Sequence, residues 1–189
     1  MAVNTLLYDN FEEILEEGLI KICNSTELIK GKPLSSEDIT GRWDYLIKDY
    51  IADAVHEFNG YPEATIAWPA FLGMAVAHYW DSDWESHKND TYHDFYGARK
   101  FDDLDEHILG EILCLPLGSE EVKHIALTVN SCSLATLALI KKQGIEPETV
   151  DGFYILARAY TVMFRIGAAI ELQRLGYKLE ALSPSKLMN

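Results

Sequence analysis

Apolar residues recur with a helical period along most of this 189-residue chain, and this period is the feature that most limits its fold. The clearest stripe follows the spacing of an amphipathic helix and consists of Trp43, Leu46, Ile47, Tyr50, Ile51, Ala54, Val55 and Phe58. No stretch keeps the alternation of apolar and polar residues that marks a half-buried β-strand. The sequence therefore predicts an all-α fold.

Short turns rich in Gly, Pro and Ser divide the periodic pattern into about six helices. We place these helices at 4–30, 35–58, 62–87, 91–115, 119–143 and 148–176. Pro69 lacks an N–H and is expected to kink or restart the third helix, and Gly97 is expected to interrupt the fourth. Short connections favour antiparallel neighbours, so we expect a single-domain bundle over residues 1–182 with a frayed tail at 183–189.

The charge balance limits the partners of the chain. It has 16 Lys and Arg residues against 30 Asp and Glu residues, a formal net charge of −14. We expect no nucleic-acid binding, because no basic cluster is available to neutralise phosphates. We expect no membrane association either, because the longest apolar stretch, 125–140, is interrupted by polar residues and is shorter than a bilayer span. The first residues are acidic and lack a basic, apolar leader, which predicts a cytoplasmic location.

The three cysteines, Cys23, Cys114 and Cys132, lie among apolar residues and lack the paired spacing of zinc ligands. We predict that they are buried and reduced, as is common for isolated cysteines in such surroundings.

Histidines and acids gather on the third and fourth predicted helices. At 100° per residue, His78 and Glu111 fall on otherwise apolar faces, whereas Asp53 and His56 face solvent. One hypothesis is that a zinc, iron or manganese ion is held by His78, Asp81, Glu85, His107 and Glu111. The alternative, favoured because no fixed metal-binding motif is present, is a set of structural polar pairs and no cofactor.

Aromatic and acidic residues are interleaved between Trp68 and Asp103, and this region is the second candidate. Trp80 and Trp84 lie on a helix face different from that of His78, so one face must be exposed or covered. The candidate partner or ligand surface consists of Trp80, Trp84, Tyr92, Phe95 and Tyr96. The alternative is that residues 90–103 fold back as a cover, which would make this cluster part of the core.

The helix at 148–176 is apolar nearly all round apart from a narrow polar stripe that includes Arg158 and Arg165. Two arginines on one stripe could hold an anionic small molecule, or they could pair with the surplus acids of the chain. A helix of this kind is either the centre of a bundle or an oligomer contact. The sequence thus allows a homodimer through helices 119–143 and 148–176.

Taken together, these patterns favour a protein that binds rather than an enzyme. We expect a protein-binding or regulatory module that offers an aromatic and acidic surface to a basic or apolar partner. One alternative is a metal-dependent hydrolase, in which a metal-bound water would be the nucleophile. The other is a DNA-mimic inhibitor that uses the N-terminal acids to occupy a nucleic-acid-binding protein.

Overall fold

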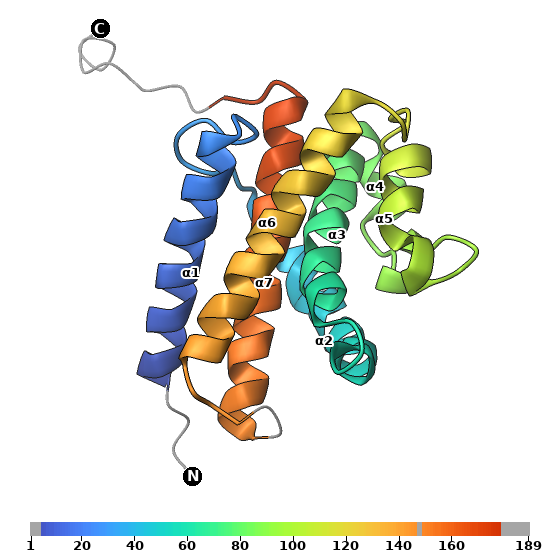
Figure 1. Cartoon of the computed structure of the whole chain (residues 1–189). Helices are drawn as coiled ribbons and strands as arrows, with labels where there is room; N and C mark the ends of the chain where they lie inside the picture. The colour runs from blue at the N-terminus through green and yellow to red at the C-terminus, as the bar shows by residue number, and fades with distance from the viewer. Residues whose placement is uncertain (1–4, 147–148, 179–189) are drawn as a thin grey trace, which may run out of the picture.

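The computed structural model describes residues 5–146 and 149–178 and confirms the all-α prediction, with seven α-helices rather than six. Within the described residues there is no β-strand, only an isolated bridge between Gly97 and Lys100. The helices are α1 (Thr5–Ser25), α2 (Glu37–Phe58), α3 (Pro62–Ser82), α4 (Trp84–His87), α5 (Leu104–His107), α6 (Glu120–Lys142) and α7 (Val150–Arg174). Figure 1 shows the long helices side by side, with α4 and α5 at one edge. The predicted tail at 183–189 lies outside the described residues.

Local sequence signals set the ends of the long helices. The side chain of Ser119 accepts a hydrogen bond from the Val122 N–H, and Thr149 caps α7 in the same way through Gly152. Two acids, Glu120 and Glu121, follow Ser119 in the first turn of α6, where their negative charges interact favourably with the positive end of the helix dipole. The boundaries predicted for the fifth helix are close to those observed. Those of the second helix are also close, although Ser36 at its start forms no side-chain cap hydrogen bond.

The centre of the bundle is the crossing of α3 and α7. An added Cβ atom on Gly73 would lie 2.1 Å from the Phe164 carbonyl oxygen, and one on Gly167 would lie 1.7 Å from that of Ala70. The two backbones therefore approach each other more closely than any larger side chain would permit. Of the two roles considered for the last helix, α7 takes the central one, since most of its residues from Ile155 onward are buried.

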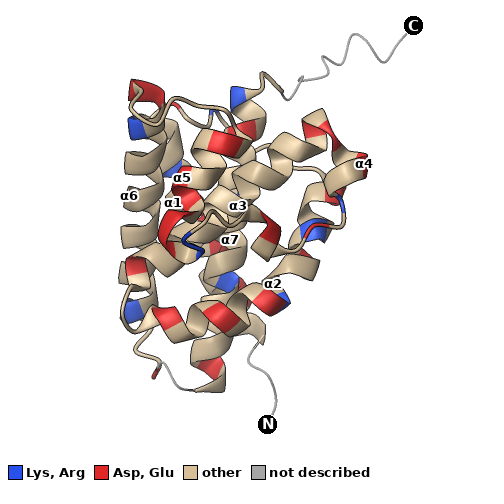
Figure 2. Ribbon diagram, turned by 90° about the vertical axis from the view of Figure 1, so that its right-hand side faces the viewer, with Lys and Arg blue, Asp and Glu red and all other residues tan. Residues whose placement is uncertain are grey.

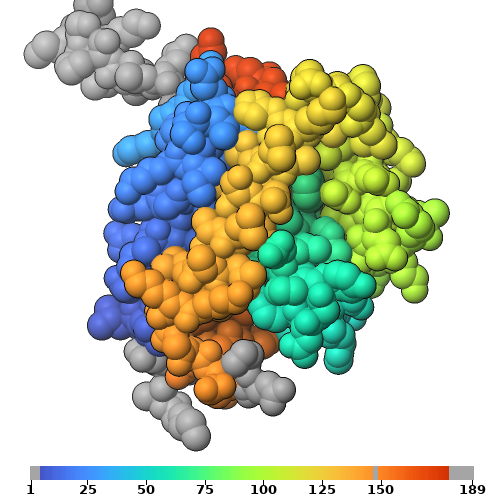
Figure 3. All heavy atoms as spheres, viewed as in Figure 1, coloured from blue at the N-terminus to red at the C-terminus, as the bar shows by residue number. Residues whose placement is uncertain are grey.

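The other long helices surround this pair. In Figures 1 and 3, α6 runs obliquely across one face of the molecule, between α1 on one side and the segment around residue 60 on the other. The Sγ atoms of Cys23 in α1 and Cys132 in α6 lie 3.8 Å apart in the core. Cys114 is exposed, so the prediction that all three thiols are buried is wrong for this residue. It lies beyond the last helical turn of its segment, where no neighbour covers it.

Two segments depart from the predicted helices. The third predicted helix, 62–87, is divided into α3, which ends at Ser82, and the short α4. Contrary to the expected restart, α3 continues through Pro69, which is buried within it. The predicted helix at 91–115 is broken into a 3₁₀ turn (Tyr92–Phe95), a loop at Gly97, a second 3₁₀ turn (Phe101–Asp103), the short α5 and a π-helical turn (Ile108–Ile112).

Two helices, α6 and α7, are each long and apolar enough to cross a membrane, judged by length and composition alone. The apolar stretch at 125–140 lies within the 23 residues of α6, and the expectation of no membrane association stays a prediction. The core helix of a soluble protein passes the same test, and 61% of the apolar window of α7 is buried within the molecule.

Candidate functional site

The structure does not bring the five residues of the predicted metal site together, and only two of them, His107 and Glu111, pair with each other. His78 Nδ1 lies 3.0 Å from Glu171 Oε1, and His107 Nδ1 lies 3.3 Å from Glu111 Oε2. Asp81 accepts a hydrogen bond from the Tyr177 hydroxyl, and Glu85 pairs with Lys88. Across 5–146 and 149–178, no three His, Cys, Asp or Glu side chains are grouped closely enough to hold a metal ion. The prediction that these five residues form one cluster is therefore wrong.

The error has a physical cause in the segment that carries Glu111. The Leu113 N–H bonds to the Ile108 carbonyl, five residues back, which is the hydrogen bond of a π-helical turn. A wider turn advances each residue by less than 100°, so the angles of an ideal α-helix do not apply here. The side chain of Glu111 is 77% exposed instead of facing the core. His56 is exposed, as expected.

The predicted aromatic surface is only partly exposed. Tyr92 and Phe95 are buried, which corrects their assignment to a partner surface. The 3₁₀ turn that carries them folds back on the bundle, where Tyr92 packs edge-on against Tyr50 and Phe95 approaches Tyr79. The segment is thus a cover, as in the alternative, and the rings that it covers are those of Tyr50 and Tyr79.

The three remaining aromatic candidates, Trp80, Trp84 and Tyr96, are half-buried against the core. Trp80 Nε1 donates a hydrogen bond of 3.2 Å to Asp38. Burial, and then the carboxylates of Asp53 and Glu57, raise the pKa of the Tyr96 hydroxyl well above its usual value. These three residues form part of the wall of the bundle and leave only their edges accessible.

Both arginines of the predicted anion site pair with carboxylates of α1. Arg158 contacts Asp9 at 2.9 Å and Glu12 at 2.7 Å, and Arg165 contacts Glu12 at 2.6 Å and Glu16 at 3.2 Å. An anion approaching either guanidinium would meet these carboxylates. The structure thus agrees with the second alternative for these arginines. They pair with surplus acids of the chain and connect α1 to α7.

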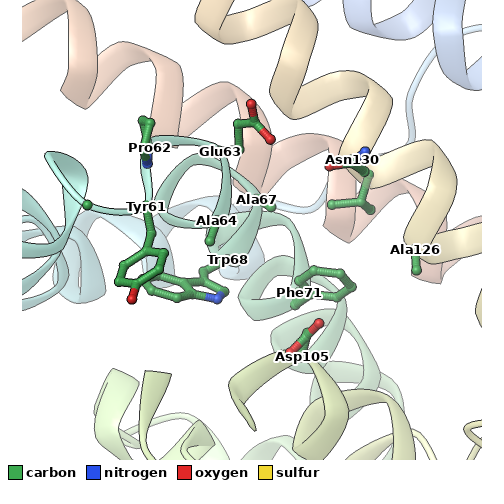
Figure 4. Close-up of a pocket in the computed structure, with 12 residues that line it drawn as sticks. Tyr61, Pro62, Glu63, Ala64, Ala67, Trp68, Phe71, Asp105, Ala126 and Asn130 are labelled. Atoms are coloured by element: carbon green, nitrogen blue, oxygen red, sulfur yellow. The ribbon is translucent and has the colours of Figure 1, made fainter. Parts of the chain in front are cut away.

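One hollow surface of the molecule lies beside the N-terminal half of α3. It consists of two adjoining hollows of about 490 Å³ each that share Tyr61, Ala64, Trp68 and Asp105. The first hollow extends toward α6, where Asn130 lines it, and the second extends toward the loop at 99–102. Figure 4 shows the first hollow with these residues around it. We call the two hollows together the Asp105 groove.

The spacing of residues on α3 builds one wall of the Asp105 groove. Tyr61, Ala64, Trp68 and Phe71 recur at three- and four-residue intervals, so they lie on one face of the helix that Pro62 begins. Trp68 stacks on Phe101 with ring centroids 4.4 Å apart and an interplanar angle of 11°. This stacking holds the loop after Gly97 against α3 and fixes the Trp68 ring as a floor.

Asp105, in the first turn of α5, supplies the charge at the middle of the groove. Burial raises the pKa of its carboxyl group, backbone hydrogen bonds partly offset this, and the nearby carboxylates of Glu106 and Asp103 raise it further. No Lys, Arg or His side chain of the described ranges forms an ion pair with Asp105. Arg99, which lines the second hollow, pairs instead with Asp103 and Glu106. Lys100 also lines the second hollow, but Asp105 forms no ion pair with it or with any other described residue.

More acids surround the same groove. Glu63 lines the first hollow, and Glu57 and Asp102 line the second. Aromatic faces and carboxylates are the two kinds of group that attract organic cations. The arrangement therefore suits an ammonium or guanidinium group that contacts the Tyr61 and Trp68 rings and pairs with Asp105.

The sequence pattern alone does not single out Asp105 or Tyr61. Asp105 belongs to an acidic run at 102–106, a pattern typical of a solvated surface. The available signal was the aromatic face on α3, which the Trp68-to-Asp103 cluster included only through Trp68.

Comparisons with known proteins do not name a relative for this chain. No protein-family model matches it, no curated protein is similar to it, and no solved structure matches its structure. What the chain binds is therefore inferred from the Asp105 groove itself.

Proposed function

We propose that this chain is a protein-binding module that accepts a lysine or arginine side chain of a basic partner protein in the Asp105 groove. The observation that carries the proposal is the half-buried Asp105 carboxylate, which lines the groove together with Trp68 and forms no ion pair with any described Lys, Arg or His side chain. A partner cation would supply the missing charge. Pairing in a partly desolvated site is stronger than pairing on an open surface.

The aromatic residues would add to this attraction. A cation above a tyrosine or tryptophan face gains about 0.5–1 kcal/mol at an exposed site and more in a desolvated one. Tyr61 is exposed and Trp68 is buried, so the groove has one ring in contact with solvent and one that is largely desolvated. The methylene groups of a lysine side chain would cover the apolar Ala64 and Ala67 between them.

The charge of the whole molecule supports the same class of partner. A net charge of −14 attracts basic proteins over long distances and raises their association rate at low salt. Figure 2 shows acids distributed over several helices, so this long-range field does not by itself select one site. Selection of a particular side chain would come from the groove.

The proposal is tested by calorimetric titration with a short oligolysine peptide and with the same peptide acetylated on every lysine. We expect binding of the first peptide only. Asp105→Asn should weaken binding at least tenfold, about 1.4 kcal/mol, and Tyr61→Ala should weaken it several-fold. Asp44→Asn, at an exposed position on α2, removes the same charge outside the groove and should leave the affinity within about twofold of the unmutated chain.

Two results would contradict the proposal. One is equal weakening by Asp105→Asn and Asp44→Asn, which would mean that the peptide responds only to net charge. The other is the absence of binding to the unmutated chain at low salt. Circular dichroism of each variant checks that its helices are intact.

A further inference from the structure

The outward face of α6 differs from the outward faces of the other long helices. No charged or histidine residue occurs between His124 and Lys141, a span of α6 that includes several solvent-facing positions. Figure 2 shows these middle turns without charge colour. Two large apolar side chains on this face are open to solvent, Leu127 at 67% and Leu134 at 44%. We call the exposed residues Leu127, Asn130, Ser131, Leu134 and Ala138 the α6 face.

The contrast with α1 shows how unusual this is in such a chain. The solvent side of α1 carries Asp9, Glu13, Glu17 and Lys21, as expected for a surface helix. Figure 3 shows α6 lying across the front of the molecule, with no other described part of the chain over it. An uncharged helix face of this length on an acidic molecule is suited to contact with another protein surface.

The charges at the two ends of α6 indicate which surface that is. Exposed acids, Glu120 and Glu121, begin the helix, and exposed bases, Lys141 and Lys142, end it. A helix of 23 residues is about 34 Å long, so these charges stand far apart on one copy. In an antiparallel pair of identical helices they would lie opposite each other.

We propose that the α6 face is the interface of a homodimer in which two α6 helices pack antiparallel about a two-fold axis. An axis that passes between Asn130 and Ser131 places Leu127 opposite Leu134 of the second copy. The same axis places Glu120 opposite Lys141 of the second copy. Each contact occurs twice, as required of an isologous interface.

The existing contacts of the end residues are compatible with this arrangement. Glu120 pairs with Lys123 at 2.7 Å, but both side chains are largely exposed and such pairs contribute little stability. Lys141 forms no ion pair with any described residue. Glu121 is also close to Arg174, which makes Glu120 the better residue to change.

The polar residues in the middle of the face favour a second copy over lipid. Asn130 and Ser131 would meet across the axis, where an amide and a hydroxyl can hydrogen-bond to each other. In lipid the same groups would have no partner outside their own helix. Of the two helices first considered for a dimer, α6 offers a continuous exposed face, while α7 is mostly buried.

The first experiment is sedimentation equilibrium of the full chain from about 1 to 100 µM, the range in which a moderate dimer dissociates. We expect twice the 21.4 kDa chain mass at the upper end. Leu127→Asp should give the single-chain mass throughout, since it places a carboxylate opposite the apolar Leu134 side chain on each side of the axis. Val55→Asp is the matched control, because Val55 is 40% exposed on α2 and lies off the α6 face. This control should remain dimeric.

A second experiment tests the antiparallel register. Glu120→Lys and Lys141→Glu each bring like charges together twice and should each raise the dimer dissociation constant about tenfold or more. An equimolar mixture of the two variants restores opposite charges at both ends, so it should form a heterodimer about as tight as the unmutated homodimer. Native mass spectrometry distinguishes this heterodimer from either homodimer once one variant is isotopically labelled.

The proposal is overturned if the unmutated chain has the single-chain mass at about 100 µM, where even a weak homodimer would be detected. It is also overturned if Leu127→Asp dimerises as the unmutated chain does. Failure of the mixture to recover affinity, with both single variants weakened, would overturn the antiparallel arrangement. Thermal melting of Leu127→Asp against Val55→Asp shows whether a change in mass comes from unfolding.

Discussion

The backbone of Gly167 in α7 lies directly against the carbonyl group of Ala70 in α3, where a Cβ atom on residue 167 would come within 1.7 Å of the oxygen. Three residues after Ala70, Gly73 meets Phe164 in the same way. Contact between backbones fixes the depth at which α3 lies in the bundle. Because Trp68 lies on the same helix, this crossing also sets the position of the Asp105 groove.

We predict that Gly167→Ala lowers the free energy of unfolding by about 3 kcal/mol or more, because the methyl group would displace backbone rather than a flexible side chain. Urea unfolding followed by circular dichroism measures this change. Gly18→Ala is the control, since Gly18 lies in α1 with no atom within 4 Å of its added Cβ. It should leave stability unchanged or raise it by up to about 1 kcal/mol. Equal effects of the two substitutions would show that the crossing is not tight.

The sequence contained enough information to predict the helical class and the ends of α2 and α6, because apolar periodicity and helix caps act locally. It did not reveal the α3–α7 crossing. Gly73 and Gly167 sit inside apolar stretches, and their role depends on which helix lies opposite. The segment at 91–115 was mispredicted as a helix because tertiary packing of Tyr92 and Phe95 against the bundle overrides its local preference.

The site was harder to predict than the fold. His78 was expected on a buried face, and the structure pairs it there with Glu171. Asp105 could not be selected among its acidic neighbours, because what distinguishes it is the position of Trp68 and Asn130 on two other helices. A groove between elements distant in the sequence is set by three-dimensional packing, and periodicity within one helix carries no information about it.

We predict that Asp105→Asn stabilises the fold at about pH 8 and has no such effect at about pH 4. Burial raises the pKa of Asp105, so the folded state holds the proton more tightly than the unfolded state does. The cost of the charged form therefore develops as pH rises through the raised pKa, and Asn avoids this cost. Thermal melting of the variant and of Asp44→Asn at both pH values measures the difference. A higher melting temperature for Asp105→Asn at the low pH only would contradict the prediction.

The same titration should control binding. We predict that the affinity for the oligolysine peptide falls as pH is lowered through the raised pKa of Asp105, because the protonated acid cannot pair with a cation. Calorimetric titrations at several pH values give this profile. The Asp105→Asn variant should show a flatter profile over the same range. An identical pH dependence in both proteins would place the responsible group elsewhere.

Glu171 is a second buried carboxylate, and unlike Asp105 it has ion-pair partners. Glu171 is completely buried and accepts hydrogen bonds from Arg174 at 2.7 and 2.8 Å, with His78 on its other side. We predict that Arg174→Met lowers the free energy of unfolding by about 3–5 kcal/mol, because it leaves a buried charge without its main partner. Adding Glu171→Met should recover most of this loss. Arg99→Met, which removes the ion pairs of a largely exposed guanidinium, should cost less than about 1 kcal/mol in the same urea titration.

The three thiols should differ in their reactivity toward alkylating reagents. Cys114 is exposed, whereas Cys23 and Cys132 are fully buried and contact each other. The hydrogen bond with Cys23, and then burial, raise the pKa of Cys132, which disfavours its reactive thiolate. We predict that iodoacetamide at neutral pH modifies one thiol in the folded chain and all three in denaturant, counted by intact mass. Cys114→Ser should show no modification when folded. Rapid labelling of a second site in that variant would mean that the α1–α6 contact opens readily, because those two cysteines lie where these helices meet.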